Sequence, residues 1–195
     1  MERLSFEMTA FIGSHELSPS VFRAIESSLD LGHFDRPLLQ NLSELTFQQN
    51  VGGISLRDVC VFLGPRLKTL HLSIPVLFDS LGTFAEVLKA KCPAIENLYI
   101  SNSYRREEPV DRVMSDIICS LSSLRVVSWD GICDSQTLKY LSSLPLWSLD
   151  VRLPQEFAQG GFLDASSNIL PFLAMRHLHI SVASIADTGQ FLQAT

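Results

Sequence analysis

The segment LKTLHL, residues 67–72, places apolar residues at its first, fourth and sixth positions. Its last three residues alternate apolar, polar and apolar, which is the period of a half-buried strand. The same arrangement recurs at five other places: LSELTF at 42–47, IENLYI at 95–100, LRVVSW at 124–129, LWSLDV at 146–151 and MRHLHI at 175–180. The pattern predicts six strands of the same kind.

The spacing of these copies indicates an internal repeat. Their middle apolar residues are Leu45, Leu70, Leu98, Val127, Leu149 and Leu178. The chain is also rich in leucine and serine, a bias that is itself a reason to search for repeats. The uneven steps from one copy to the next fall within the range of about 20–29 residues that is typical of leucine-rich repeats.

The segments between the copies have a helical pattern. Residues 109–121 carry one apolar stripe at helical spacing, with Pro109 in the first turn and acidic residues at the start. Shorter stripes predict three more helices: one after Ser18 as N-cap, one around residues 84–88, and one from Ser135 to Leu141. Each repeat is therefore predicted to be a strand followed by a returning helix.

One strand and one helix cannot enclose a core, but stacked copies bury their leucines against each other. We therefore expect an α/β leucine-rich-repeat solenoid, with a curved parallel sheet on the concave face and helices on the convex face. Residues 1–195 are expected to form one such domain, with irregular repeats of about 22–29 residues. The chain begins near a partial strand, Leu4–Phe6, and stops inside an apparent helix at 191–195, which favours an array truncated at both ends.

Composition excludes several classes of protein. Hydrophobic residues make up 46% and charged residues 18%, which is enough apolar material for a core. The net charge of −6 disfavours nucleic-acid binding. No apolar run reaches the roughly 18 residues of a membrane span, and no secretory signal is visible. The expected location is cytoplasmic or nuclear.

The sequence contains no recognisable catalytic or cofactor motif. G-x-S-x-G, H-E-x-x-H and the glycine-rich nucleotide loops are absent. The four cysteines, Cys60, Cys92, Cys119 and Cys133, have neither zinc-ligand nor redox spacing, so they are interpreted as buried reduced thiols. A catalytic cysteine is the minor alternative. We expect no enzyme activity, no cofactor and no metal; His177 and His179, two residues apart on a strand, are only a weak metal signal.

Three longer segments resemble the leucine-rich-repeat region of F-box proteins, particularly the irregular kind common in mushroom-forming fungi. They are FLGPRLKTLHL at 62–72, LKAKCPAIENLYI at 88–100 and DIICSLSSLR at 116–125. The resemblance covers roughly residues 17–193. It implies the substrate-binding repeats of a ubiquitin-ligase receptor. The helical F-box that docks a Skp-type adaptor is not found in this chain, so that partner is expected only if a longer form carries one.

In such a fold, the residues flanking each middle apolar position face the concave side. The distinctive members of that surface are His71, Tyr99, Asp130, Asp150, Arg152, His177 and His179. Because neighbouring strands lie about 4.8 Å apart, Asp150 is expected beside His179, and Asp130 beside Arg152. The functional interpretation is a protein-binding surface. The alternative is an ordinary solvated sheet face.

The main functional hypothesis is a non-catalytic protein-recognition module, acting as a ubiquitin-ligase substrate receptor. Two alternatives remain open. One is a stand-alone repeat scaffold with no link to ubiquitin. The other is a small α/β enzyme on a doubly wound sheet, which would bind its ligand at the carboxyl ends of the strands. An inactive fragment that aggregates through its exposed edge strands is a further possibility.

Overall fold

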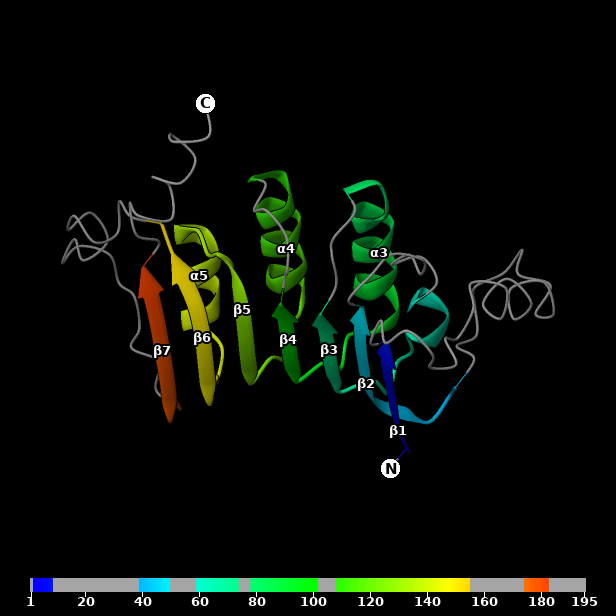
Figure 1. The fold of residues 1–195 in the computed structure, drawn as a ribbon. Coiled ribbons are helices and arrows are strands. Elements are labelled where there is room, and N and C mark those ends of the chain that lie inside the picture. Colours follow the sequence, from blue (N-terminus) through cyan, green and yellow to red (C-terminus); the bar gives the residue numbers. More distant parts are fainter. Residues whose placement is uncertain are drawn as a thin grey trace.

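The computed structural model describes residues 2–8, 39–49, 59–73, 78–101, 108–154 and 174–182. Within them, parallel strands form one seven-stranded sheet whose spatial order follows the sequence, from β1 to β7 (Figure 1). The strands are β1 Glu2–Met8, β2 Leu42–Gln49, β3 Thr69–Ser73, β4 Asn97–Ser101, β5 Val126–Ile132, β6 Ser148–Leu153 and β7 His177–Val182.

All six predicted strands are confirmed, and their register follows the repeat. The middle apolar residues pair from strand to strand: Leu45 with Leu70, then Leu98, Val127, Leu149 and Leu178. The partial strand expected at Leu4–Phe6 belongs to β1, a seven-residue strand that pairs with β2 along its length. Equivalent positions of successive copies therefore lie in straight rows across the sheet.

Three α-helices occur in the described residues: α3 Phe78–Lys91, α4 Glu108–Ser120 and α5 Ser135–Ser142, besides the short 3₁₀ helix η1 Cys60–Phe62. They confirm the predicted helices around residues 84–88, 109–121 and 135–141. The helix predicted after Ser18 lies outside the described residues. In α5 the N-cap is Asp134, whose carboxylate accepts a hydrogen bond of 2.7 Å from the backbone N–H of Thr137.

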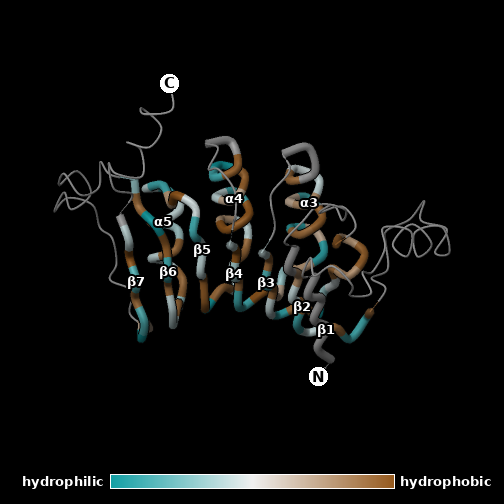
Figure 2. The backbone as a smooth tube through the Cα atoms, in the orientation of Figure 1, coloured by the Kyte–Doolittle hydropathy of each residue, from teal (hydrophilic) through white to brown (hydrophobic). Residues whose placement is uncertain are grey.

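The helices lie on one face of the sheet (Figure 1). In β3 to β6 every second residue points toward them and is buried, whereas on the edge strand β7 the corresponding Leu178 and Ile180 are exposed. The predicted stripe of α4 supplies Met114, Ile117 and Ile118 to the same core, and α3 supplies Phe84 and Leu88. Hydrophobic and hydrophilic residues accordingly alternate along strands and helices (Figure 2).

No described helix or strand covers the opposite side of the sheet, which we call the open face (Figure 1). Its residues are those predicted from the repeat, because alternation along a strand sends the flanking positions away from the helices. The expectation of an α/β fold with a parallel sheet is thus confirmed. Because the strands follow the order of the sequence, open-face residues of consecutive strands lie next to each other.

One predicted pairing is wrong in register. Asp130 was expected opposite Arg152, but Arg152 pairs with Ile132. The reason is a bulge in β5: between Trp129 and Ile132 this strand advances three residues while β6 advances one. Gly131, which is buried, lies inside the bulge. Extra residues on one strand shift every later pairing.

Candidate functional site

A continuous row of side chains crosses the middle of the open face. The register aligns one residue from each of six strands, namely Thr46, His71, Tyr99, Ser128, Asp150 and His179. Four of the seven residues singled out from the sequence therefore lie in this one row: His71, Tyr99, Asp150 and His179. We call it the central row.

On β3 and β4 the central row holds two stacked rings. The imidazole of His71 and the phenol ring of Tyr99 have centroids 4.1 Å apart and an interplanar angle of 1°. Burial lowers the pKa of His71 below its ordinary value, and the nearby carboxylate of Glu44 opposes this shift. At neutral pH the imidazole is therefore uncharged, and it presents a flat, neutral surface together with Tyr99.

On β5, β6 and β7 the central row is a polar chain built around Asp150. One carboxylate oxygen lies 2.7 Å from Nδ1 of His179, as the sequence predicted. The other accepts a hydrogen bond of 3.4 Å from the Ser128 hydroxyl. The side chains of Asp150 and His179 are exposed, 51% and 73% respectively, so this pair is available to a partner.

The order of these three groups determines their chemistry. In a serine nucleophile the base accepts a hydrogen bond from the hydroxyl, and the acid orients that base. Here Asp150 lies between Ser128 and His179, so the imidazole is on the far side of the carboxylate. The arrangement can accept and donate hydrogen bonds to a ligand, but it does not align His179 to deprotonate Ser128.

The remaining predicted site residues lie away from the central row. His177 pairs in register with Ser148 and is exposed, two positions before His179 on β7. Arg152 follows Asp150 on β6 and lies opposite the bulge, whereas Asp130 is an exposed residue within it. The structure thus brings Asp150 and His179 into contact and leaves the other three at the margins of the face.

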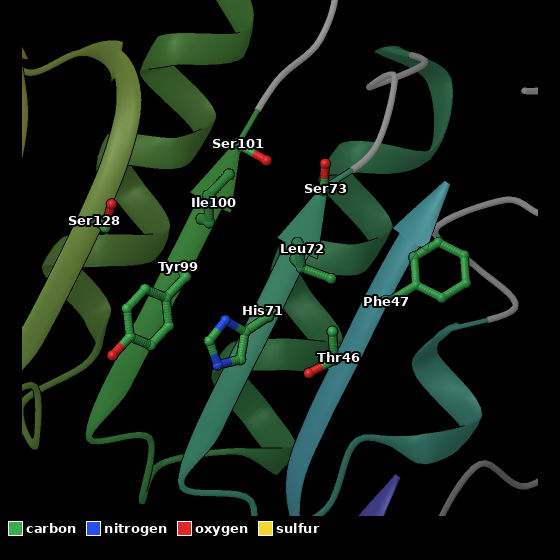
Figure 3. Close-up of a pocket in the computed structure, with 9 residues that line it drawn as sticks. All are labelled: Thr46, Phe47, His71, Leu72, Ser73, Tyr99, Ile100, Ser101 and Ser128. Carbon is green, nitrogen blue, oxygen red and sulfur yellow. The ribbon is translucent and has the colours of Figure 1, made fainter. Parts of the chain in front are cut away.

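A pocket of about 220 Å³ opens beside the stacked rings, toward the ends of β2 to β5 (Figure 3). It is lined by Thr46, Phe47, His71, Leu72, Ser73, Tyr99, Ile100, Ser101 and Ser128. None of these residues carries a formal charge at neutral pH, and five of them bear hydroxyl groups. Of the lining residues, the sequence analysis singled out His71 and Tyr99, and the pocket itself follows from the strand register and from the stacking of these two rings.

The sequence predicted no metal site and four buried, reduced cysteines. In the described ranges no group of three or more potential ligands is positioned to hold a metal, and Nδ1 of His179 already contacts Asp150. Cys60, Cys92 and Cys133 are buried and belong to no disulfide, as predicted, and Cys119 is half-buried. Burial raises the pKa of Cys92 and of Cys133 to about 12, so neither is a ready nucleophile.

The described helices include none with the length and apolarity required to cross a bilayer. Comparison of the chain with protein-family models, with curated proteins and with solved structures found no significant match.

Proposed function

We propose that this chain is a non-catalytic protein-recognition module whose open face binds a protein partner. The observation that carries the proposal is the central row, in which six strands present polar and aromatic side chains in register. The pocket beside His71 and Tyr99 adds a concave, neutral site next to the hydrogen-bonded pair of Asp150 and His179. Tyrosine, such as Tyr99 here, is among the residue types enriched at the positions that contribute most of the binding energy in protein interfaces.

We further propose that the fold is a leucine-rich-repeat solenoid with the open face concave. Two features support this: copies with the spacing of leucine-rich repeats pair at equivalent positions, and a helix returns on the same side after β3, β4 and β5. The resemblance to F-box proteins then suggests a ubiquitin-ligase substrate receptor. A Skp-type adaptor enters this proposal only through a longer form that carries an F-box.

The stand-alone scaffold uses the same surface and differs only in lacking the adaptor. The enzyme alternative has less support. A doubly wound sheet binds its ligand where the strand order reverses, and the described strands run from β1 to β7 with no reversal. The order of Ser128, Asp150 and His179 also gives no activated nucleophile.

The test compares two double variants of the full chain. The first, His71→Ala with Tyr99→Ala, removes the stacked rings; the control, Asp116→Ala with Lys139→Ala, alters exposed positions on α4 and α5. Proteins captured by the native chain are purified, and their affinities are measured by calorimetry. A true partner should bind the first variant at least tenfold more weakly and the control unchanged. Equal affinity for both variants would contradict recognition through the open face.

The ubiquitin link is tested separately, by isolating the natural protein with an antibody and measuring its intact mass. A longer form that copurifies a Skp-type adaptor supports the receptor role. If no longer form recovers the adaptor, the receptor role is wrong, while the recognition module stands or falls on the calorimetry.

A further inference from the structure

A second row of side chains lies at the edge of the sheet where the strands begin, outside the open face. Its members each lie one residue before a strand, and backbone hydrogen bonds of 2.7–2.8 Å connect each N–H to the carbonyl of the preceding member. They are Lys68, Glu96, Arg125, Trp147 and Arg176. Because this ladder continues the sheet, neighbouring members are spaced by about 4.8 Å.

The last three members form a layered cluster that we call the Arg–Trp–Arg ladder. The guanidinium carbon of Arg125 lies 4.9 Å from the centroid of the Trp147 ring, and that of Arg176 lies 5.9 Å away. Both distances are within the range of a cation–π contact. Trp147 is nevertheless 46% exposed, the one aromatic residue among the large exposed apolar side chains of the described chain.

The first two members neutralise each other. The Lys68 ammonium lies 2.7 Å from a carboxylate oxygen of Glu96, and this hydrogen bond lowers the pKa of Glu96. Arg125 is also within electrostatic reach of Glu96, although its guanidinium lies over Trp147. The row as a whole therefore becomes positive toward Arg176, on a chain whose formal net charge is −6.

The ladder has the properties of a site prepared for carboxylates. Arginine presents a planar fork of donors that matches a carboxylate, and stacking on a ring limits the freedom that the side chain loses on binding. Tryptophan and arginine are also the residue types most enriched at the energetic centres of protein interfaces. A basic spot confined to three residues of an acidic chain suits a short acidic segment better than a long polyanion, which the remaining negative charge repels.

We propose that the Arg–Trp–Arg ladder binds an acidic peptide segment of a protein partner. Arg125 and Arg176 are separated by two strand spacings, about 10 Å. Side chains of an extended chain share a face at every second residue, so carboxylates four residues apart lie on one face and span about 13 Å, which two long arginine side chains can reach. The fitting segment thus carries two carboxylates four residues apart, with an apolar side chain midway between them against Trp147. This site is distinct from the open face and does not depend on the function proposed for it.

The test uses the full chain and a short fluorescein-labelled peptide with two glutamates four residues apart, leucine midway between them and serine at the two other intervening positions. Binding is followed by fluorescence anisotropy at low and at physiological salt. The matched peptide carries glutamine in place of both glutamates. We expect the glutamate peptide to bind about tenfold more tightly than the glutamine peptide and to weaken as salt increases.

Three variants locate the site. Arg176→Gln should weaken binding of the glutamate peptide about tenfold. Lys139→Gln, which removes an exposed positive charge from α5, should leave it unchanged, as should Tyr99→Ala on the open face. Thermal melts of each variant establish that it folds.

Equal binding of the two peptides, or equal binding by Arg176→Gln and the native chain, would overturn the proposal. A short single-stranded DNA that binds more tightly than the glutamate peptide, and loses affinity in Arg176→Gln, would replace it with a nucleic-acid site.

Discussion

The bulge in β5 depends on a position that has no room for a side chain. A Cβ atom built on Gly131 lies about 2.5 Å from a ring carbon of Trp129 and from a carboxylate oxygen of Asp111 on α4, and it also meets the indole nitrogen. Trp129 is only 3% exposed, so its ring cannot turn away into solvent. We therefore predict that Gly131→Ala forces both the indole of Trp129 and the carboxylate of Asp111 to move.

The cost is that of overpacking a well-packed core, about 1–3 kcal/mol. For a chain of this size, each kcal/mol corresponds to a Tm lower by roughly 2–4 °C. The assay is urea and thermal unfolding, followed by far-ultraviolet circular dichroism and by tryptophan emission. The emission of the buried Trp129 should shift in the folded state of the variant, because the new methyl group contacts its ring.

The matched control is Gly82→Ala in α3. Gly82 is exposed, and a Cβ atom built there meets nothing within 4 Å. Alanine is favoured over glycine in a helix interior by about 1 kcal/mol, so the same chemical change should stabilise the chain at this position. A Gly131→Ala variant as stable as the native chain would refute the reasoning, since it would mean that β5 and α4 are not packed as described.

Three further predictions follow from burial. The pKa of His71 is lowered from 6.5 by burial, so below about pH 6.5 the unfolded chain binds a proton that the folded chain does not, and the free energy of unfolding should decrease as the pH falls. His71→Phe keeps a ring against Tyr99 but cannot titrate. Urea unfolding of this variant at several pH values should lack this part of the pH dependence. Iodoacetamide followed by peptide mass mapping should modify the half-buried Cys119 before the buried Cys92, and equal rates in the folded chain would contradict the assigned burial. Leu149 and Leu178 are partners in the ladder but are 1% and 53% exposed, so Leu149→Ala should cost about 2–5 kcal/mol and Leu178→Ala less than about 1 kcal/mol in urea unfolding.

The strands and their register could be predicted from the sequence because both follow from one periodic signal. A residue next to a middle apolar residue has the same orientation in every copy, which is why the contact between Asp150 and His179 can be predicted from the sequence alone. The pairing of Asp130 with Arg152 failed for a local reason. A glycine within a strand can mark a bulge, but the packing around Gly131 involves the side chains of Trp129 and of Asp111 on α4, and the strand alternation does not specify those contacts.

The stacked rings and the pocket could not be predicted from the sequence, for a different reason. Register places His71 beside Tyr99, but alternation alone gives no rotamers, and a parallel stack needs both rings to take compatible ones. The Arg–Trp–Arg ladder was missed because its members precede the strands. Their pattern is visible only once the backbone hydrogen bonds show that the sheet ladder continues one residue further toward the amino ends.

The two halves of the open face differ in chemistry, and under the proposed function this difference would set the direction in which a partner lies on it. Toward β2, β3 and β4 the face offers hydroxyl groups and two neutral rings around the pocket. Toward β6 and β7 it offers a carboxylate and an imidazole in contact. A partner that places an uncharged side chain in the pocket and a polar group at Asp150 has one favourable direction across the strands. If such a partner were turned end for end, its uncharged side chain would cover the Asp150 carboxylate. That charge would then be removed from water without a polar group to bind it, which is costly. The parallel register gives neighbouring strands the same backbone pairing, so the selectivity of the proposed module would come from this change of side chains along the central row.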